Sequence, residues 1–394
     1  MNELSRLLEL PDAEKAQLGL VHTPGEIAQQ PDTWNKTFEL FLSQRESIQK
    51  FLTSARVTGA GTSEAIVYLV GAGTSDYTGR AISYLLRKMW QCEVIAVPST
   101  DLLTQMDQLI LPRRKYLWIS FSRSGDSSEG VAVLEKAREQ LPDIHHIVIS
   151  CNANGRMLQD SVGDPKTLGI CMIDEANDRG LAMTSSFSNM VIFGQCMAHI
   201  QNIEAYEPLL RKLITGGKSI LPRAADCAAS VAKQGYTKAC FVGSGPLREV
   251  AKESALKVLE MSAGKTLTMT ESTLGLRHGP MAALDDQSLF VCFLSSDKRA
   301  QGYERDLLRE IGTKKIARRR IVVSGSELTT DSYAEDYLAP AGVTAIADEY
   351  RAPVDVMFGQ LIGLFNSIQW KLKPDSPSPA GVITRVVEKV NIYS

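Results

Sequence analysis

The segment "AIVYLVGAGTSDYTGRAISYLLRKMW" (residues 65–90) joins an apolar run, a turn rich in glycine and hydroxyl side chains, and an amphipathic stretch. This order predicts a buried strand, a tight turn and a helix. It recurs in "YLWISFSRSGDSSEGVAVLEKARE" (116–139), and further apolar runs lie at "EVIAVPST" (93–100), "HHIVISCN" (145–152) and "LGICMID" (168–174). Strands that alternate with helices predict βαβ units and a parallel sheet.

The same pattern begins again in the second half of the chain. The repeated segments are "KACFVGSGPLREVAKESALKVL" (238–259), "SLFVCFLSSDKRAQGYERDLLREI" (288–311) and "RRIVVSGS" (319–326). The offset from Gly71 to Gly243 equals the offset from Phe121 to Phe293. The strand-end serines, 150 and 324, are separated by an offset that is only slightly larger. This near-constant spacing indicates an internal duplication of one α/β domain.

We therefore predict an α/β fold of two tandem domains, each a parallel sheet flanked by helices in the doubly wound, flavodoxin-like manner. Residues 1–45 are expected to form an N-terminal helical segment. The first domain is expected over 46–212, with the phosphate site, and the second over 213–373, joined near 209–219. The Pro/Ser-rich residues 374–394 are expected to form an extended tail.

Composition excludes several classes of protein. The net charge of -2 and the absence of a basic face argue against a nucleic-acid partner. No apolar run is long enough to cross a bilayer, and the N-terminus lacks the pattern of a secretory signal. The seven cysteines have no metal-ligand spacing, so we expect reduced thiols in a cytoplasmic protein with neither metal nor other cofactor.

Two hydroxyl-rich turns follow predicted strands in the first half. The candidate ligand-binding side chains in these turns are Thr74, Ser75, Ser122, Arg123, Ser124 and Ser127. Ligands of parallel sheets bind at the carboxyl ends of the strands, and each turn leads into a helix N-terminus, which favours anions. This predicts a site for a phosphate monoester, although the same hydroxyls could be only helix caps. The corresponding turns of the second half, "GSGPLR" and "FLSSDKR", are weaker, so we expect a single phosphate site.

The two turns together resemble the sugar isomerase (SIS) domain, which occurs twice in the isomerase half of glucosamine-6-phosphate synthase. Four further segments resemble that family in order: "EIAQQP" (26–31), "LAMTSSFS" (181–188), "KESALKVLE" (252–260) and "GLRHGP" (275–280). The segments "ESTLGLRHGP" and "VVEKVNIYS" are most similar to AgaS-type proteins of amino-sugar catabolism, which act on galactosamine 6-phosphate. The resemblance implies that the turn residues bind phosphate, with Thr184 near the sugar. Arg123 stands where the synthase has glutamine.

The resemblance also implies catalytic roles. Glu253, Lys257 and Glu260 have i, i+4, i+7 spacing and share one face of a predicted helix, a pattern that also occurs in solvated charge stripes. By similarity, Glu260 moves a proton between C1 and C2, and the other two tune it. His278, which could otherwise be a simple turn residue, would open the sugar ring from a neighbouring subunit. The enzyme would then be at least a homodimer.

Two further positions depart from the synthase. Gly275 stands where the synthase has glutamate, and Glu271 is expected to fill part of that space. Arg385, in the tail expected to complete the active site, stands where the synthase has a lysine that forms a Schiff base. Arginine is a poor imine former, so we expect Arg385 to orient the substrate instead.

The resemblance implies a deaminating isomerase. Since the chain begins at Met1-Asn2 with no amidotransferase segment, we expect the direction that releases ammonia. Galactosamine 6-phosphate would give tagatose 6-phosphate and ammonia, through hydrolysis of a 2-imine. A ketose/aldose isomerase that keeps its substrate's nitrogen is one alternative. A non-catalytic regulator that senses sugar phosphates is another.

Overall fold

The computed structural model describes residues 1–58, 65–326, 333–386 and 390–393 of the 394-residue chain. Residues 387–389 and 394 of the predicted tail therefore lie outside the described part. The chain forms two compact units, each assembled from segments that are distant in the sequence. Unit 1 comprises Met1–Asp32, Asp178–Thr184 and Pro208–Ile383. Unit 2 comprises Thr33–Asn177, Ser185–Glu207 and Thr384–Ser394.

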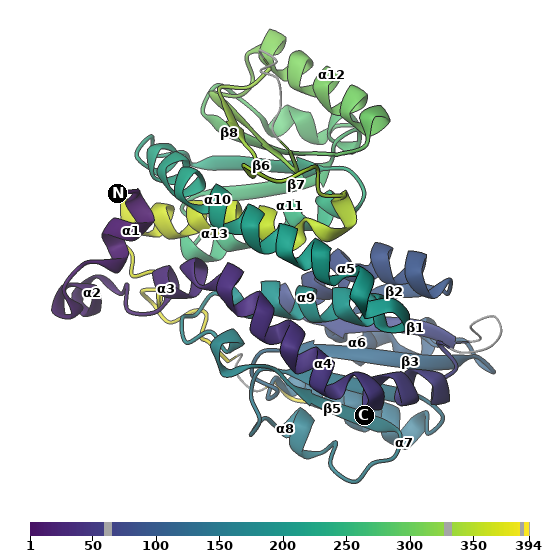
Figure 1. The fold of residues 1–394 in the computed structure, drawn as a ribbon. Coiled ribbons are helices and arrows are strands. Elements are labelled where there is room, and N and C mark those ends of the chain that lie inside the picture. Colours follow the sequence, from purple (N-terminus) through teal and green to yellow (C-terminus); the bar gives the residue numbers. More distant parts are fainter. Residues whose placement is uncertain (59–64, 327–332, 387–389, 394) are drawn as a thin grey trace. The chain divides into compact units, whose positions relative to one another are not determined.

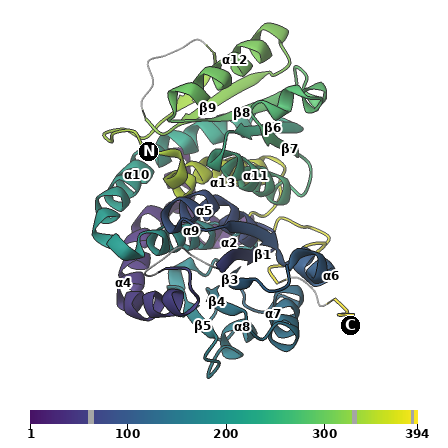
Figure 2. The same ribbon diagram turned by 90° about the vertical axis from the view of Figure 1, so that its right-hand side faces the viewer.

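Unit 2 contains a parallel five-stranded sheet with the order β2-β1-β3-β4-β5 (Figure 1). Its strands are β1 (Ala65–Gly71), β2 (Val94–Pro98), β3 (Lys115–Ser122), β4 (His145–Ser150) and β5 (Thr167–Cys171). Its helices are α4 (Gln30–Ser54), which begins in unit 1, α5 (Thr74–Trp90), α6 (Ser99–Leu109), α7 (Ser128–Gln140), α8 (Arg156–Gln159) and α9 (Ser185–Ala198), with the 3-10 helices η1 (Asp174–Ala176) and η2 (Ile200–Ala205). Helices α5 and α9 cover one face of the sheet, and α6, α7 and α8 cover the other (Figures 1 and 2).

Unit 1 contains a second parallel five-stranded sheet, with the order β10-β9-β8-β6-β7. Its strands are β6 (Lys238–Gly243), β7 (Leu267–Ser272), β8 (Ser288–Leu294), β9 (Arg319–Ser324) and β10 (Asp336–Leu338). Its helices are α1 (Glu3–Leu8), α2 (Asp12–Leu18), α3 (Thr23–Ala28), α10 (Glu207–Ala232), α11 (Pro246–Met261), α12 (Lys298–Lys314) and α13 (Ala352–Gln369), with the 3-10 helices η3 (Gly275–Arg277), η4 (Pro280–Ala283) and η5 (Asp348–Tyr350). Helices α11 and α13 cover one face of the sheet and α12 covers the other (Figures 1 and 2).

The two sheets have the same topology and the same register. When the strands of each unit are numbered in chain order, both sheets have the doubly wound strand order 2-1-3-4-5. Val70 pairs with Ser120 between β1 and β3, and Val242 pairs with Cys292 between β6 and β8. Both members of the second pair follow those of the first at the offset that separates the repeated glycines. These sheets confirm the predicted fold class of two parallel sheets flanked by helices.

Burial explains why these runs form central strands and helices. Strand β8 is buried along its whole length, as expected where helices cover both faces of a parallel sheet. Helix α9 is also buried throughout and is apolar around most of its circumference, which is typical of a helix in the core. Trp34 and Trp118 are fully buried in unit 2.

Several features of the structure were not anticipated from the sequence. The segment expected to join the two domains, 209–219, lies inside the 26-residue helix α10. Strands β7 and β10 were not predicted, because β7 is only partly buried and β10 has three residues. After α13, the described tail residues form turns and bends. Among the described residues, no helix combines the length and apolarity needed to cross a membrane.

Candidate active site

The turn between β1 and α5 is shaped by two glycines. A Cβ on Gly71 would lie 2.4 Å from the backbone carbon of Ser75, so only glycine allows the first turn of α5 to pack against the strand end. Gly73 precedes the helix with a φ of +56°, which favours glycine. Thr74 and Ser75 are buried in the first turn of α5, where the Ser75 N–H donates to the Ala72 carbonyl at 3.1 Å.

The loop between β3 and α7 brings the other predicted phosphate ligands together. The Ser122 hydroxyl accepts a hydrogen bond from the Gly125 N–H at 2.9 Å, and the Ser124 hydroxyl accepts one from the Asp126 N–H at 3.2 Å. Each serine therefore keeps its hydroxyl proton for donation. Ser127 is the N-cap of α7, but its side chain forms no capping hydrogen bond with the helix. The loop thus presents hydroxyls at a helix N-terminus, which suits an anion.

Two arginines meet at this loop. Arg123 is almost fully buried, and its guanidinium donates to the backbone carbonyl of Arg385 at 2.7 Å. The Arg385 side chain donates to Asn177 Oδ1 at 2.6 Å. Residue Val390 also lies near the loop, since its N–H is 3.4 Å from the hydroxyl of Ser128. Unit 2 therefore brings both predicted arginines together and adds Asn177, which the sequence did not indicate.

Helix α11 in unit 1 carries the predicted acid–base residues. The Lys257 ammonium lies 3.4 Å from Glu253 Oε1 and donates a short hydrogen bond to Glu260 Oε1. The side chains of Lys257 and Glu253 are 1% and 0% exposed, whereas that of Glu260 is 19% exposed. The predicted helical face is therefore an interacting cluster with one accessible carboxylate, rather than a solvated stripe.

Glu271 lies near the end of β7, and His278 follows shortly after this strand. Glu271 Oε1 accepts hydrogen bonds from Arg248 at 2.6 Å and from the Ser272 N–H at 2.8 Å. A Cβ on Gly275 would lie 2.4 Å from the Ser272 hydroxyl and 3.2 Å from the Glu271 carboxyl group, so Glu271 does lie against this glycine. His278 directly follows η3 and is exposed.

Thr184 occupies a fully buried position in unit 1. Its hydroxyl donates to Asp178 Oδ1 at 3.0 Å, and its N–H donates to Asp178 Oδ2 at 2.9 Å. Glu26, from the "EIAQQP" segment, accepts hydrogen bonds from the N–H groups of Arg179 at 2.5 Å and Gly180 at 3.2 Å. Burial, with the nearby Asp178 charge, raises the pKa of Glu26 to about 8. The motif therefore anchors the loop that precedes α9, a role that its sequence did not reveal.

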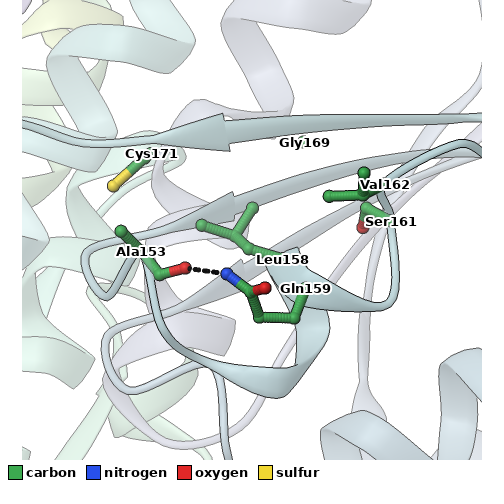
Figure 3. A pocket seen from close by; sticks show the side chains of 7 residues that line it. All are labelled: Ala153, Leu158, Gln159, Ser161, Val162, Gly169 and Cys171. Carbon is green, nitrogen blue, oxygen red and sulfur yellow. Dashed lines mark hydrogen bonds between the residues drawn. The ribbon is translucent and has the colours of Figure 1, made fainter.

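A pocket of about 330 Å³, lined by none of the predicted site residues, lies between α8 and the edge strand β5 (Figure 3). It is lined by Ala153, Leu158, Gln159, Ser161, Val162, Gly169 and Cys171. The Gln159 amide donates to the Ala153 carbonyl at 2.7 Å, which closes one side of the pocket. Burial raises the pKa of the Cys171 thiol, which disfavours the nucleophilic thiolate. This pocket has no acid–base pair and is not a candidate for catalysis.

Among the described residues, no group of three or more His, Cys, Asp or Glu side chains is arranged to hold a metal ion. The side chains described above are hydroxyl and guanidinium donors in unit 2 and a carboxylate–ammonium cluster in unit 1.

Comparison with known proteins agrees with this inventory. The SIS domain family matches residues 62–200. The AgaS protein of Streptomyces coelicolor is 35% identical over 95% of this chain and 96% of its own. The AgaS proteins of Escherichia coli and Shewanella sp. strain ANA-3, each named a D-galactosamine-6-phosphate deaminase, are 32% and 30% identical over 94% and 100% of this chain and 95% and 96% of their own.

Solved structures give the same picture. The crystal structure of tagatose-6-phosphate ketose/aldose isomerase from Escherichia coli has a TM-score of 0.84 and 29% identity, with 94% of this chain and 96% of that chain covered. A Clostridium novyi structure reaches a TM-score of 0.90 at 29% identity, with 96% of each chain covered. The C-terminal domain of glucosamine-fructose-6-phosphate aminotransferase from Francisella tularensis shares the fold, at 18% identity, a TM-score of 0.73, and coverage of 88% of this chain and 96% of that chain. The chain is thus an enzyme of the SIS-domain family and belongs to its AgaS group.

Proposed function

We propose that this enzyme converts D-galactosamine 6-phosphate to D-tagatose 6-phosphate and ammonia, as a deaminating aldose–ketose isomerase of amino-sugar catabolism. The observation that carries the proposal is the α11 cluster, in which a buried lysine holds one partly exposed carboxylate, Glu260. Isomerisation between C1 and C2 needs a single positioned base of this kind. Support for the substrate comes from the names of the Escherichia coli and Shewanella relatives.

The substrate's phosphate is bound, in this proposal, by the two loops of unit 2. The hydroxyls of Ser75, Ser122, Ser124 and Ser127 are neutral donors, and the N-termini of α5 and α7 add backbone N–H groups. Arg123 adds a charged donor, and charge-assisted hydrogen bonds to phosphate are about twice as strong as neutral ones. These contacts hold the substrate equally before and after the reaction, so they set binding more than the chemical rate.

Glu260 performs the proton transfer. Its carboxylate removes the C2 proton of the open-chain amino aldose, the electron pair of that C–H bond forms a C1–C2 double bond, and the carbonyl oxygen takes a proton from water to become a hydroxyl. Glu260 then returns its proton to C1 while the amino nitrogen gives up a proton to water, which leaves an imine at C2. Water adds to this imine and ammonia departs, giving the ketose. Lys257 fixes the direction of the Glu260 carboxylate, and Glu253 holds Lys257 from the other side.

His278 opens the sugar ring by exchanging a proton between the ring oxygen and the C1 hydroxyl. An imidazole can act both as an acid and as a base near neutral pH. We propose that it does so in the site of a second copy of the chain, which requires a homodimer. Its exposed position is compatible with this role. Arg385 and Thr184 are proposed to orient the sugar, and we expect the enzyme to act in the cytoplasm.

The decisive experiment measures ammonia release from galactosamine 6-phosphate, glucosamine 6-phosphate and their N-acetyl forms. Ammonia from the galacto amine, with tagatose 6-phosphate as co-product, is the expected result. The second candidate is a tagatose-6-phosphate ketose/aldose isomerase, which is favoured by the name of the Escherichia coli structure. Isomerisation of tagatose 6-phosphate without any ammonia from the four amines would replace the first proposal by the second. If no substrate turned over, the enzyme proposal would give way to a sugar-phosphate sensor.

A further inference from the structure

The unit 1 loop between β8 and α12 is the counterpart of the phosphate loop of unit 2. Ser296 follows Ser124 at the same offset that relates the registers of the two sheets, and both residues lie just after the third strand of their sheet. The two loops therefore start from equivalent points of one topology. They differ in what fills them.

A carboxylate from the same chain occupies the unit 1 loop. Asp348 Oδ1 accepts hydrogen bonds from the Ser296 N–H at 2.7 Å and from the Ser296 hydroxyl at 2.8 Å. Asp348 Oδ2 accepts a short hydrogen bond from the Ser295 hydroxyl. One carboxylate thus takes a backbone donor and two hydroxyl donors, which is the arrangement expected around an oxygen-rich anion.

A guanidinium completes this arrangement. Arg351 is 0% exposed, and its Nη1 lies 3.3 Å from Asp348 Oδ1. The same guanidinium donates to the carbonyls of Leu294 at 2.5 Å and Val323 at 3.1 Å, at the carboxyl ends of β8 and β9, and pairs with Asp355 at 2.7 Å. Its Nε–H has no hydrogen-bond partner among the described residues, although it is buried. A buried arginine with a spare donor beside two serines is a built anion site rather than a chance contact.

The counterpart of Asp348 in unit 2 points to the same conclusion. The 3-10 helix η5 begins at Asp348, and η1 begins at Asp174, which stands earlier by the offset of the strand-end serines. The preceding residues, Ile173 and Ala347, have almost the same backbone angles (φ −59° and −66°, ψ 149° and 146°). Yet Asp174 is exposed, whereas the Asp348 side chain is only 14% exposed. The same position of the fold carries an exposed carboxylate in one unit and an inserted one in the other.

Two neighbouring acids and a proline occupy or remove further backbone donors near this loop. Asp297 caps α12 by accepting from the N–H groups of Arg299 and Ala300. The buried Glu304 accepts from the Ser295 N–H at 2.7 Å. The first turn of α11 begins with Pro246, which has no N–H at all.

We propose that unit 1 contains a second oxyanion site of the SIS type, and that the Asp348 carboxylate occupies it in place of a phosphate group. In the native enzyme this internal ligand excludes sugar phosphates from unit 1 and stabilises the loop. Removal of the carboxylate turns the loop into a functional site for inorganic phosphate. The proposal concerns the architecture of unit 1 and does not depend on which sugar the enzyme converts.

The test counts the inorganic phosphate ions bound per chain, by isothermal titration calorimetry at constant ionic strength. It compares the wild type, D348A and the matched control D174A, which removes the same side chain from the equivalent position of unit 2. We expect D348A to bind about one phosphate per chain more than the wild type, and D174A to bind the same number as the wild type. Adding S296A to D348A should abolish the gain.

The difference between D348A and the wild type in the number of bound phosphate ions tests the proposal whether or not unit 2 binds free phosphate. A folded D348A protein that binds no additional phosphate would overturn the proposal, as would an equal gain in D174A. If D348A does not fold in chloride, it is refolded in phosphate, and recovery of the native circular dichroism only in phosphate supports the proposal. D348S keeps a short polar side chain and is titrated in the same way. A folded D348S without the extra phosphate would equally reject the internal ligand.

Discussion

The two sheets share strand order and register, but they carry different chemistry. Helix α11 of unit 1 presents an ionisable cluster on one face: Glu253, Lys257 and Glu260. The equivalent residues in α5 of unit 2 lack such a cluster: Ala81, Leu85 and Lys88. Ala81 and Leu85 are apolar and buried, and Lys88 is exposed. The proposed acid–base cluster therefore lies on one of these two equivalent helices and not on the other.

The loops after the third strand of each sheet also differ, but here unit 2 carries the side chains suited to a ligand. Unit 2 has hydroxyls and Arg123 at the strand end, while in unit 1 the equivalent loop is filled by Asp348. A few side chains thus decide whether a loop of this fold is open to a ligand or filled by a carboxylate of its own chain. The fold alone does not determine which of the two occurs. In the proposed function, unit 2 binds the phosphate group and unit 1 carries the proton transfer. Four experiments can break or sharpen this division.

The largest effect is expected from E260Q. The amide cannot accept the C2 proton, so we expect kcat to fall by at least about 100-fold, with binding of the sugar phosphate retained. The measurement is steady-state ammonia release, with the substrate's Kd determined separately. E249Q is the matched control, because Glu249 lies on the same helix and pairs with a different lysine, Lys252, at 2.9 Å. Wild-type kcat in E260Q would remove Glu260 from the role of base.

H278A should produce the next largest effect. Loss of the ring-opening group should reduce turnover of the cyclic substrate by about 100-fold, and much less for an open-chain analogue. Because His278 is proposed to act in the neighbouring site, mixing H278A with E260Q under subunit exchange should restore part of the activity. Exchanged mixtures that stay as inactive as the separate variants would show that both residues serve the same chain's site.

S124A and S296A compare the two loops directly. S124A should raise KM about tenfold at nearly unchanged kcat, since it removes one donor to the phosphate. S296A should leave KM unchanged but lower the free energy of unfolding by about 1–2 kcal/mol, because the buried Asp348 carboxylate loses a hydrogen bond. Steady-state kinetics and urea unfolding measure the two effects. Equal effects of both variants on KM would contradict the division between the units.

The smallest effect concerns the loop anchor in unit 1. The native pKa of Glu26 is raised from 4.5 to about 8, so the folded state holds this proton more tightly than the unfolded chain does. The contribution of Glu26 to the free energy of unfolding is fully present below about pH 4.5 and is lost as the pH rises toward 8. E26Q should therefore flatten the decline of unfolding free energy between pH 5 and pH 8, measured by urea unfolding. As a control, E9Q changes an exposed glutamate and should leave the pH dependence of the unfolding free energy as it is in the wild type. A decline in E26Q as steep as in the wild type would contradict the raised pKa of Glu26.

The fold was largely predictable because its signals are local. Apolar runs, the turns after them and the amphipathic helices repeat at a fixed offset, and each is read within a window of about 20 residues. The two strands that escaped prediction lie at sheet edges: β7 and β10. Edge strands need less burial, so their sequences lack a continuous apolar run.

The candidate site was predictable only in part. The cluster of α11 followed from i, i+4, i+7 spacing, since a helix brings such residues together whatever surrounds it. The anchoring of the buried Thr184 by Asp178 was not foreseen, nor was the bond from Arg385 to Asn177 across 208 positions. The second of these bonds depends on where distant loops come to lie, which no local period encodes.

By itself, the sequence determined the duplicated α/β pattern, the hydroxyl-rich turns of the first half and the ionisable face of α11. Only the tertiary structure decided that the unit 1 loop is closed, because Asp348 reaches Ser296 from 52 positions away. It also decided that the "EIAQQP" glutamate holds a backbone loop 154 positions away. The physical reason is the same in both cases. A buried carboxylate must find donors wherever the fold provides them, and that partner is set by packing rather than by sequence neighbours.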